Sequence, residues 1–175
     1  IRILNQSFNK ITGNEIDLYP NSHAEEIDAM NDAIYEPINN GVYRTGFATS
    51  QETYEQAFTV LFDRLDELEK HLEGRSFLIG EKLTEADIRL LPTLLRFDLV
   101  YYVHFKCNWK RIADYVNLSQ YTRRLFEIEA VRITTDFEHI KRHYFFSHEN
   151  INPNRINPYT RARGVRISIR HLVHK

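Results

Sequence analysis

The sequence predicts an all-α fold. Along most of the chain, apolar residues recur three or four positions apart, which is the spacing of one face of a helix. No stretch alternates apolar and polar residues in the manner of a half-buried strand. Six glycines and five prolines in 175 residues suit a helical protein with few tight turns. We therefore expect a bundle of helices joined by loops.

The bulk composition is that of an ordinary globular domain. Hydrophobic residues make up 42% and charged residues 27% of the chain, which suits a single domain with a substantial core. The formal net charge of −1 gives no reason to expect a nucleic-acid or anionic-membrane partner. No apolar run approaches the roughly 20 residues that span a bilayer. One cysteine allows no internal disulfide, and we expect no signal peptide, so a cytoplasmic location is predicted.

The first two helices are expected before residue 39. The chain opens directly on an apolar helical stripe without a capping residue, which leads us to expect further sequence before it. A capping box at 22–25 should start the second helix, and Pro37 should kink or end it. Residues 39–52 are expected to form a loop with two glycines. The two stripes consist of Ile1, Leu4, Phe8 and Ile11, and of Ile27, Met30, Ile34 and Ile38.

The third helix should follow a second capping box at 49–52 and stop before Gly74. Its apolar stripe consists of Tyr54, Ala57, Phe58, Leu61, Leu65, Leu68 and Leu72. Acidic residues occupy the opposite side, which we expect to face solvent.

The most informative segment lies between residues 76 and 104. Thr84 is a candidate N-cap, and Asp87 stands at the third helical position, from which its carboxylate reaches back to the cap. Residues 88–103 are apolar nearly all round, which predicts a helix in the middle of the domain. Thr84 and Asp87 are therefore assigned a structural role, with Asp87 as a buried carboxylate bonded to backbone N–H groups.

Shorter helices are expected at 109–114, 118–129 and 132–145. From residue 150 onward the chain is basic and contains no acidic residue. Pro153 and Pro158 make the first part of this segment extended. We interpret the chain as a helical domain over 1–150 and a basic extended or disordered tail over 151–175. A disordered or non-native tail is favoured over a nucleic-acid arm, because a run of charge alone is weak evidence.

Four segments carry a resemblance to a known family. SFLIGEKLTEADI, at 76–88, resembles the C-terminal signature of glutathione transferases, in which a loop leads into a capped, buried helix. Three further segments narrow the resemblance to one class within that family. They are NNGVYRTGFATSQ at 39–51, RFDLVYYVHFKCN at 96–108 and HIKRHYFFSHENINP at 139–153. In this order they resemble the glutathionyl-hydroquinone reductases, or Xi-class glutathione transferases, over roughly residues 1–158.

The resemblance implies a function for the whole enzyme that this chain shares only in part. In the family, a thioredoxin-like N-terminal domain holds the nucleophilic cysteine and most of the site for the co-substrate glutathione. Neither is present here, so no catalytic residue is expected in this chain. The C-terminal domain supplies the wall that binds the aromatic quinol, and homodimers are implied. By resemblance, Tyr43 and Tyr144 donate hydrogen bonds to the hydroquinone oxygens.

Tyrosine suits that role chemically. A phenol hydroxyl ordinarily has a pKa of about 10, so it is neutral at pH 7 and donates to a developing oxyanion. Its ring can also stack on an aromatic substrate. Without the resemblance, Tyr43 and Tyr144 would more simply be core or rim aromatics.

Other candidate residues favour structural interpretations. Cys107 lies near His104 and Lys106, which could lower its pKa, but a buried apolar role is preferred. His139 and His143 have the spacing of two metal ligands but no evident third ligand, so no metal site is predicted.

Two further sets of charged residues also favour structural roles. Arg96 and Asp98 are expected to form a structural ion pair. The basic residues Lys106, Lys110 and Arg111 are expected to form a solvated face rather than an anion site.

Two other hypotheses compete with the reductase. Helical domains of this type also serve as stand-alone interaction modules without catalytic activity. A degraded or frameshifted gene product would explain the unusual basic ending. An upstream thioredoxin-like reading frame would exclude the interaction module.

Overall fold

The computed structural model describes residues 1–159, and within this range the chain is entirely helical apart from its connections. The all-α prediction is thereby confirmed. In this described part of the chain, ten α-helices are joined by connections that include two π-helical turns, Tyr35–Asn39 and Phe97–Tyr101. The helices are α1 Arg2–Gln6, α2 Asn9–Thr12, α3 Ala24–Ile34, α4 Gly41–Gly46, α5 Gln51–His71, α6 Glu85–Arg96, α7 Tyr102–His104, α8 Val116–Phe126, α9 Glu129–Thr134 and α10 Phe137–Ser147.

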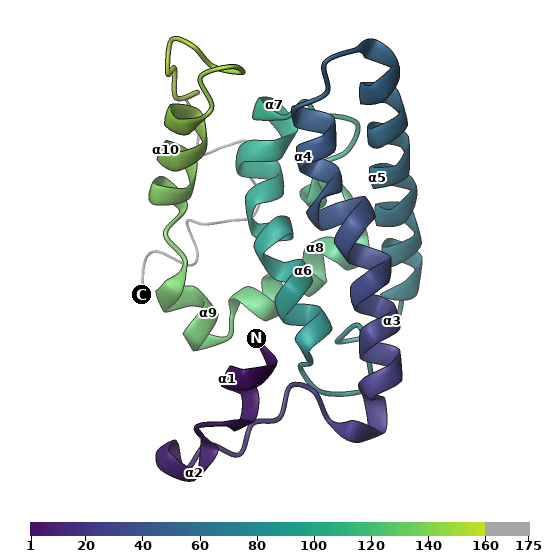
Figure 1. The fold of residues 1–175 in the computed structure, drawn as a ribbon. Helices are drawn as coiled ribbons and strands as arrows, with labels where there is room; N and C mark the ends of the chain where they lie inside the picture. The colour runs from purple at the N-terminus through teal and green to yellow at the C-terminus, as the bar shows by residue number, and fades with distance from the viewer. Residues whose placement is uncertain (160–175) are drawn as a thin grey trace.

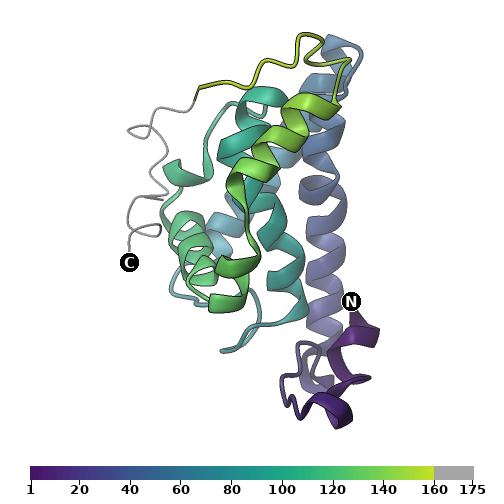
Figure 2. The same ribbon diagram turned by 90° about the vertical axis from the view of Figure 1, so that its left-hand side faces the viewer.

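Three long helical columns form the body of the molecule. The first is α3 continued by α4, the second is α5, and the third is α6 continued by α7 (Figure 1). Helices α8 and α9 close one side, and α10 runs alongside the third column, as a view from that side confirms (Figure 2). The apolar faces of the columns meet in one core, which includes the fully buried Ile27, Leu61, Phe62, Leu65, Leu90, Leu94 and Phe97.

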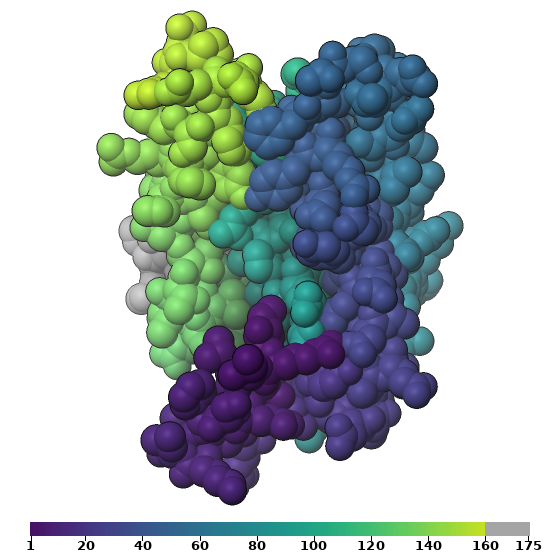
Figure 3. Space-filling view, viewed as in Figure 1, coloured from purple at the N-terminus to yellow at the C-terminus, as the bar shows by residue number. Residues whose placement is uncertain are grey.

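The first twelve residues form two short helices and not one. Helix α1 ends at Gln6, and α2 begins at Asn9 after a turn. The predicted apolar stripe exists, but its members are exposed, so no burial stabilises a continuous helix there. This segment projects from the body as the purple lobe of Figure 3.

The region around Pro37 departs most from the sequence prediction. The capping box at 22–25 is wrong, because a 3₁₀ turn, Asn21–His23, precedes α3 and His23 makes no side-chain cap. Helix α3 ends at Ile34, before Pro37, as predicted. The wider π turn then continues the column past the proline, and the N–H of Asn40 bonds to the carbonyl of Tyr35 at 2.9 Å. The expected loop at 39–52 therefore contains a helix, α4.

Helix α5 agrees with its prediction apart from a shift of one residue. Its capping box uses Ser50 and Thr53, and the Thr53 N–H donates to Ser50 Oγ over 3.2 Å. After the helix, Gly74 takes a left-handed conformation with φ of 69°. The stop predicted at Gly74 is confirmed, because L-residues with a side chain rarely adopt this φ.

The helical elements after residue 108 are shorter than predicted. The helix predicted at 109–114 is a 3₁₀ turn, Ile112–Asp114, and the helix predicted at 132–145 is divided between α9 and α10. Asp136 causes the division, because its carboxylate accepts from the His139 N–H at 2.9 Å and starts a new helix.

The start of the predicted basic tail lies within the described range. Residues 151–159 contain no helix, and Asn152 Nδ2 ties the segment together by donating to Phe145 O at 2.7 Å and Ile156 O at 2.9 Å. Lys141 Nζ donates to Pro158 O, so this stretch lies back along α10. Residues 160–175, the rest of that tail, lie outside the described residues. Across residues 1–159, no helix has the length and apolar character needed to cross a membrane.

Candidate functional site

Three tyrosine hydroxyls meet where three helical segments approach one another. Tyr43 lies on α4, Tyr101 ends the π turn that follows α6, and Tyr144 lies on α10. The Tyr43 and Tyr144 hydroxyl oxygens are 2.7 Å apart, and those of Tyr101 and Tyr144 are 2.9 Å apart. Tyr144 is therefore the central member of a chain of hydrogen-bonded phenols, which we call the tyrosine cluster.

The tyrosine cluster opens to solvent at one end only. Tyr101 is 2% exposed and Tyr144 is 7% exposed, whereas Tyr43 is 37% exposed. In the space-filling view, the third column lies at the floor of a furrow between α10 and the first column (Figure 3). Of the three phenols, Tyr43 is therefore the most accessible to solvent.

Burial keeps the deeper phenols protonated. It raises the pKa of Tyr101, and the hydrogen bond with Tyr144 and the nearby Tyr43 raise it further. Burial also raises the pKa of Tyr144, and its bond with Tyr43 acts in the same direction against the opposing bond with Tyr101. At neutral pH both groups are therefore neutral hydroxyls that can donate a hydrogen bond.

Aromatic rings support the tyrosine cluster from below. The Phe105 ring stacks on Tyr101 with centroids 5.3 Å apart and an interplanar angle of 6°, and it lies 5.3 Å from the Tyr43 ring. Gly46 makes this packing possible, because a Cβ there would lie only 2.3 Å from Phe105 ring atoms. The tyrosines are thus held by rigid packing against α7 and α4.

Two members of this cluster were predicted from the sequence, and the third was missed. Tyr43 and Tyr144 are brought together, as the resemblance implied. Tyr101 lies in the segment predicted as a helix that is apolar on all sides, so it was counted as a core residue. Nothing in the local sequence distinguishes a tyrosine whose hydroxyl is hydrogen-bonded from one that only fills the core. Its place in the block at 96–108 was the available signal.

The start of α6 is a second polar centre, and it is closed. Asp87 is fully buried, and Thr84 occupies the N-cap position before the helix. One Asp87 oxygen accepts from the Thr84 N–H at 2.8 Å and the Thr84 hydroxyl at 2.9 Å. The other accepts from the Leu78 N–H at 2.9 Å and the Tyr121 hydroxyl at 2.8 Å. Four donors surround this carboxylate, so it has no capacity left for a ligand.

Cys107 has the environment of a core residue. It is fully buried, and burial raises the pKa of its thiol to about 12. Its Sγ lies 3.8 Å from Phe105 O and 4.0 Å from Val42 O. A thiol of this kind is almost entirely protonated at neutral pH, which favours the structural role predicted for Cys107.

The expected Arg96–Asp98 ion pair is wrong. Asp98 instead accepts from the backbone N–H groups of Ile112 at 2.6 Å and Ala113 at 3.1 Å, where it caps the 3₁₀ turn. The Arg96 guanidinium donates to Pro92 O. Arg96 and Asp98 are two positions apart on a continuous helical segment, so their side chains point in different directions.

The remaining candidates are occupied elsewhere or exposed. Lys110 pairs with Asp66 at 2.8 Å, and Arg111 pairs with Asp114, so these cations are neutralised locally. His139 and His143 are exposed on α10. Among residues 1–159, no group of three or more His, Cys, Asp or Glu side chains has an arrangement suited to a metal ion.

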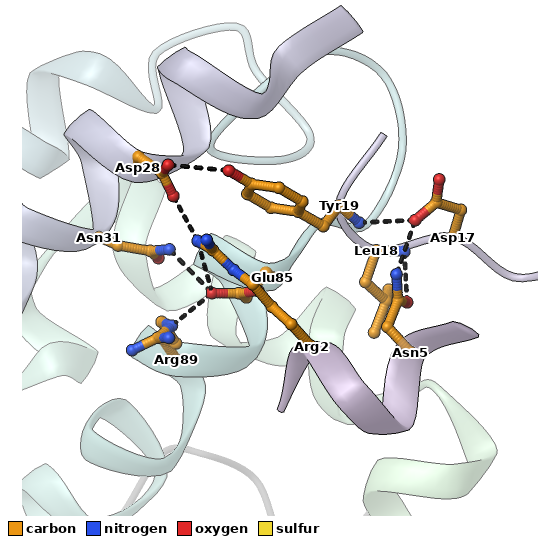
Figure 4. A network of polar contacts seen from close by, with 9 residues as sticks. All are labelled: Arg2, Asn5, Asp17, Leu18, Tyr19, Asp28, Asn31, Glu85 and Arg89. Atoms are coloured by element: carbon orange, nitrogen blue, oxygen red, sulfur yellow. Dashed lines mark hydrogen bonds and ion pairs between the residues drawn. The ribbon is translucent and has the colours of Figure 1, made fainter. Parts of the chain in front are cut away.

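An ionic network that was not anticipated from the sequence ties the N-terminal segment to the body (Figure 4). The carboxylate of Glu85 is 1% exposed and bonds to Arg2 Nε at 3.0 Å, Arg89 Nε at 2.8 Å and Asn31 Nδ2 at 3.1 Å. Burial opposes ionisation of Glu85, but the two guanidinium groups lower its pKa below the usual range. Arg2 also pairs with Asp28 on α3.

Comparison with known proteins relates this chain to a protein family. Residues 51–124 match the family model described as glutathione S-transferase, C-terminal domain. The chain is 54% identical over 158 residues to glutathionyl-hydroquinone reductase PcpF of Sphingobium chlorophenolicum, covering 90% of this chain and 50% of that protein. The chain is homologous to the C-terminal half of the glutathionyl-hydroquinone reductases.

Solved structures of these reductases and their relatives share the fold. The glutathione-S-transferase Xi of Phanerochaete chrysosporium superposes with a TM-score of 0.89 at 50% identity, over 91% of this chain and 52% of that chain. The glutathione-bound structure of YqjG, a glutathione transferase homologue of Escherichia coli, gives 0.87 at 43% identity, over 94% and 56%. The predicted glutathione-transferase C-terminal fold is confirmed. The chain spans about half the length of the curated relatives it matches.

Proposed function

We propose that this chain is the quinol-binding half of a glutathione-dependent reductase, which releases hydroquinones from S-glutathionyl-hydroquinones by thiol exchange. The observation that carries the proposal is the tyrosine cluster, in which three phenols from separate helical segments converge with hydroxyl oxygens 2.7 and 2.9 Å apart. A hydroquinone oxygen is of the same size and chemistry as the phenol oxygens it would meet. Its entry at the exposed Tyr43 would exchange a phenol–phenol bond for a phenol–quinol bond.

The proposed reaction needs a thiolate that this chain does not supply. A cysteine thiolate attacks the sulfur that joins glutathione to the aromatic ring, and the carbon–sulfur bond breaks. The electron pair passes to the ring, which takes up a proton to become the free hydroquinone. A second glutathione thiolate then displaces the cysteine from the mixed disulfide and yields oxidised glutathione. Hydroxyl donation by Tyr43 and Tyr144 would stabilise the negative charge that develops on the quinol.

The N-terminal segment is the proposed contact with a thioredoxin-like half that carries that cysteine. Helices α1 and α2 expose Ile3, Leu4 and Ile11 to between 71% and 82%. Exposed apolar side chains gathered on one short segment favour a covered surface in the complete protein. The Arg2–Glu85 network fixes the segment to α3 and α6 beside it (Figure 4).

The test is to restore the thioredoxin-like half and assay release of hydroquinone from its glutathionyl conjugate. Tyr43→Phe and Tyr144→Phe should each lower the rate. The expected loss is on the order of 10²-fold for a hydrogen bond that is made only in the transition state. Tyr102→Phe, next to the cluster on the same helical column, is the matched control and should leave the rate unchanged. A restored enzyme that contains the cysteine and shows no release would refute the proposal.

Two related expectations have their own tests. Homodimerisation is proposed from the family, and sedimentation of the restored protein at increasing concentration measures it. If the restored protein folds and dimerises but binds no quinol, the interaction module becomes the better hypothesis, because such a module needs the helical scaffold and not the phenols.

A further inference from the structure

A pair of histidines bridges the same two helical segments as the deeper phenols. His104 Nε2 and His148 Nδ1 are 3.0 Å apart, and they join the end of α7 to the residue that follows α10. His104 follows Tyr101 by three residues, and His148 follows Tyr144 by four. Because residues three and four apart share a helical face, the Tyr101–Tyr144 and His104–His148 bonds form two successive rungs between two segments.

The histidine rung is enclosed by rings that the tyrosine cluster also uses. The His148 ring stacks on Phe105 at 5.6 Å and meets the edge of the Tyr144 ring at 5.5 Å. The His104 ring is 4% exposed and contacts Phe145 at 4.7 Å. A shift of the His148 ring would therefore change the packing of Tyr144 and Phe105 directly.

Burial keeps this pair neutral. It lowers the pKa of His104 to about 4, with the neighbouring His148 acting in the same direction. Burial and the nearby His143 lower the pKa of His148 as well. The His148 ring also meets the phenol ring of Tyr144, whose hydroxyl is neutral because burial raises its pKa. Two neutral imidazoles form one N–H···N hydrogen bond, with one ring as donor and the other as acceptor.

We propose that the His104–His148 hydrogen bond positions Tyr144 for quinol binding, by fixing the end of α10 against α7. The proposal rests on the function proposed above for the tyrosine cluster. His148 is a positioning residue, because it contacts the Tyr144 ring and would affect the quinol only through that tyrosine. Directly after it the chain reverses, as the N–H groups of Ile151 and Asn152 bond back to His148 O at 3.1 and 2.9 Å. The bond to His104 is thus the last polar tie of α10 to the body before this turn.

Two variants of His148 separate the hydrogen bond from the ring. His148→Phe keeps a ring to stack on Phe105 but leaves His104 without its partner. His148→Asn places an amide close to the position of Nδ1 and can restore the bond. His139→Phe, which changes an exposed histidine on the same helix, is the matched control.

The first readout needs no ligand. In this chain labelled with ¹³C at tyrosine Cζ, the Tyr144 signal is assigned by its loss in Tyr144→Phe, and its alkaline titration is followed. We expect His148→Phe to lower the titration midpoint of Tyr144 by about one pH unit, because water reaches a loosened phenol. His148→Asn and His139→Phe should stay within a few tenths of a unit of the unaltered chain. An unchanged midpoint in His148→Phe, or a failure of His148→Asn to restore it, overturns the proposal.

The second readout is binding of methylhydroquinone, measured by calorimetry on the same variants. We expect His148→Phe to weaken binding about tenfold, as for the loss of one oriented hydrogen bond, and His148→Asn to recover most of it. If the unaltered chain and the restored enzyme both fail to bind the quinol, the function proposed above fails, and the tyrosine titration still decides whether the histidine rung holds Tyr144. If the quinol binds equally well to His148→Phe, the positioning role is refuted while the quinol site stands.

Discussion

The two ends of the central column, α6 with its π turn and α7, use buried polar groups in opposite ways. At the start, Asp87 accepts four hydrogen bonds and is fully enclosed. At the end, Tyr101 bonds to Tyr144, which bonds in turn to the partly exposed Tyr43. The first network is closed on all sides, and the second opens to solvent through one phenol.

The difference shows how one helix can carry both architecture and recognition. A saturated carboxylate has no hydrogen-bonding capacity left, so it can only hold the loop at Leu78, the cap at Thr84 and the ring of Tyr121 together. Phenols that bond to one another can exchange a partner for a ligand of the same chemistry at little cost. Saturation therefore marks the structural end, and an exchangeable bond marks the candidate binding end.

Removing the saturated carboxylate should have the largest effect. Asp87→Ala leaves buried donors without an acceptor, and we expect the free energy of unfolding to fall by about 3–5 kcal/mol. Denaturant unfolding measures this, with Asp63→Ala on the exposed side of α5 as the control. A loss below about 1 kcal/mol would mean that the network is not structurally important.

Acid should destabilise the binding end before it affects the carboxylates. His104 has a folded pKa of about 4 against an ordinary 6.5, so in this window the unfolded chain binds a proton that the folded chain does not. Stability therefore falls as the pH falls, by about 1.5 kcal/mol between pH 6.5 and pH 5. Denaturation curves at these two pH values test it, and His104→Gln should flatten the slope. An equally steep slope in that variant would contradict the assignment.

Removing the deepest hydroxyl should affect binding more than stability. Tyr101→Phe keeps the ring packed on Phe105 and removes one bond, so we expect about 1 kcal/mol less stability. Tyr144 then loses the hydrogen bond to Tyr101. The affinity of the protein for methylhydroquinone should fall about tenfold, as measured by calorimetry. Equal affinity in this variant would restrict the site to Tyr43 and Tyr144.

The smallest effect is expected at the thiol beneath α4. Cys107→Ala removes one buried sulfur and should cost about 1 kcal/mol of stability. Quinol affinity should not change, because Cys107 does not contact the phenol hydroxyls. In the unaltered folded chain, iodoacetamide should label Cys107 only slowly at pH 8, since burial raises its pKa to about 12. Rapid labelling without unfolding would show that the thiol is reachable.

Much of this organisation could be predicted from local sequence. The stripe of α5, the stop at Gly74 and the cap before α6 depend on residues a few positions apart, where spacing and side-chain chemistry suffice. The same holds for the buried character of the central column. Predictions failed where a local signal had two outcomes, as at Asp136, which divides a predicted helix in two.

The sequence by itself therefore determined the long helix α5, the cap of the central column and the presence of Tyr43 and Tyr144 on segments resembling a quinol-binding family. Only the tertiary structure decided that Tyr101 completes the tyrosine cluster, that Asp98 caps a 3₁₀ turn, and that Glu85 is bonded to Arg2. These bonds join residues from 14 to 83 positions apart in the chain. Such partners meet only after the columns pack, because helical periodicity fixes which face a residue occupies and not what lies opposite it.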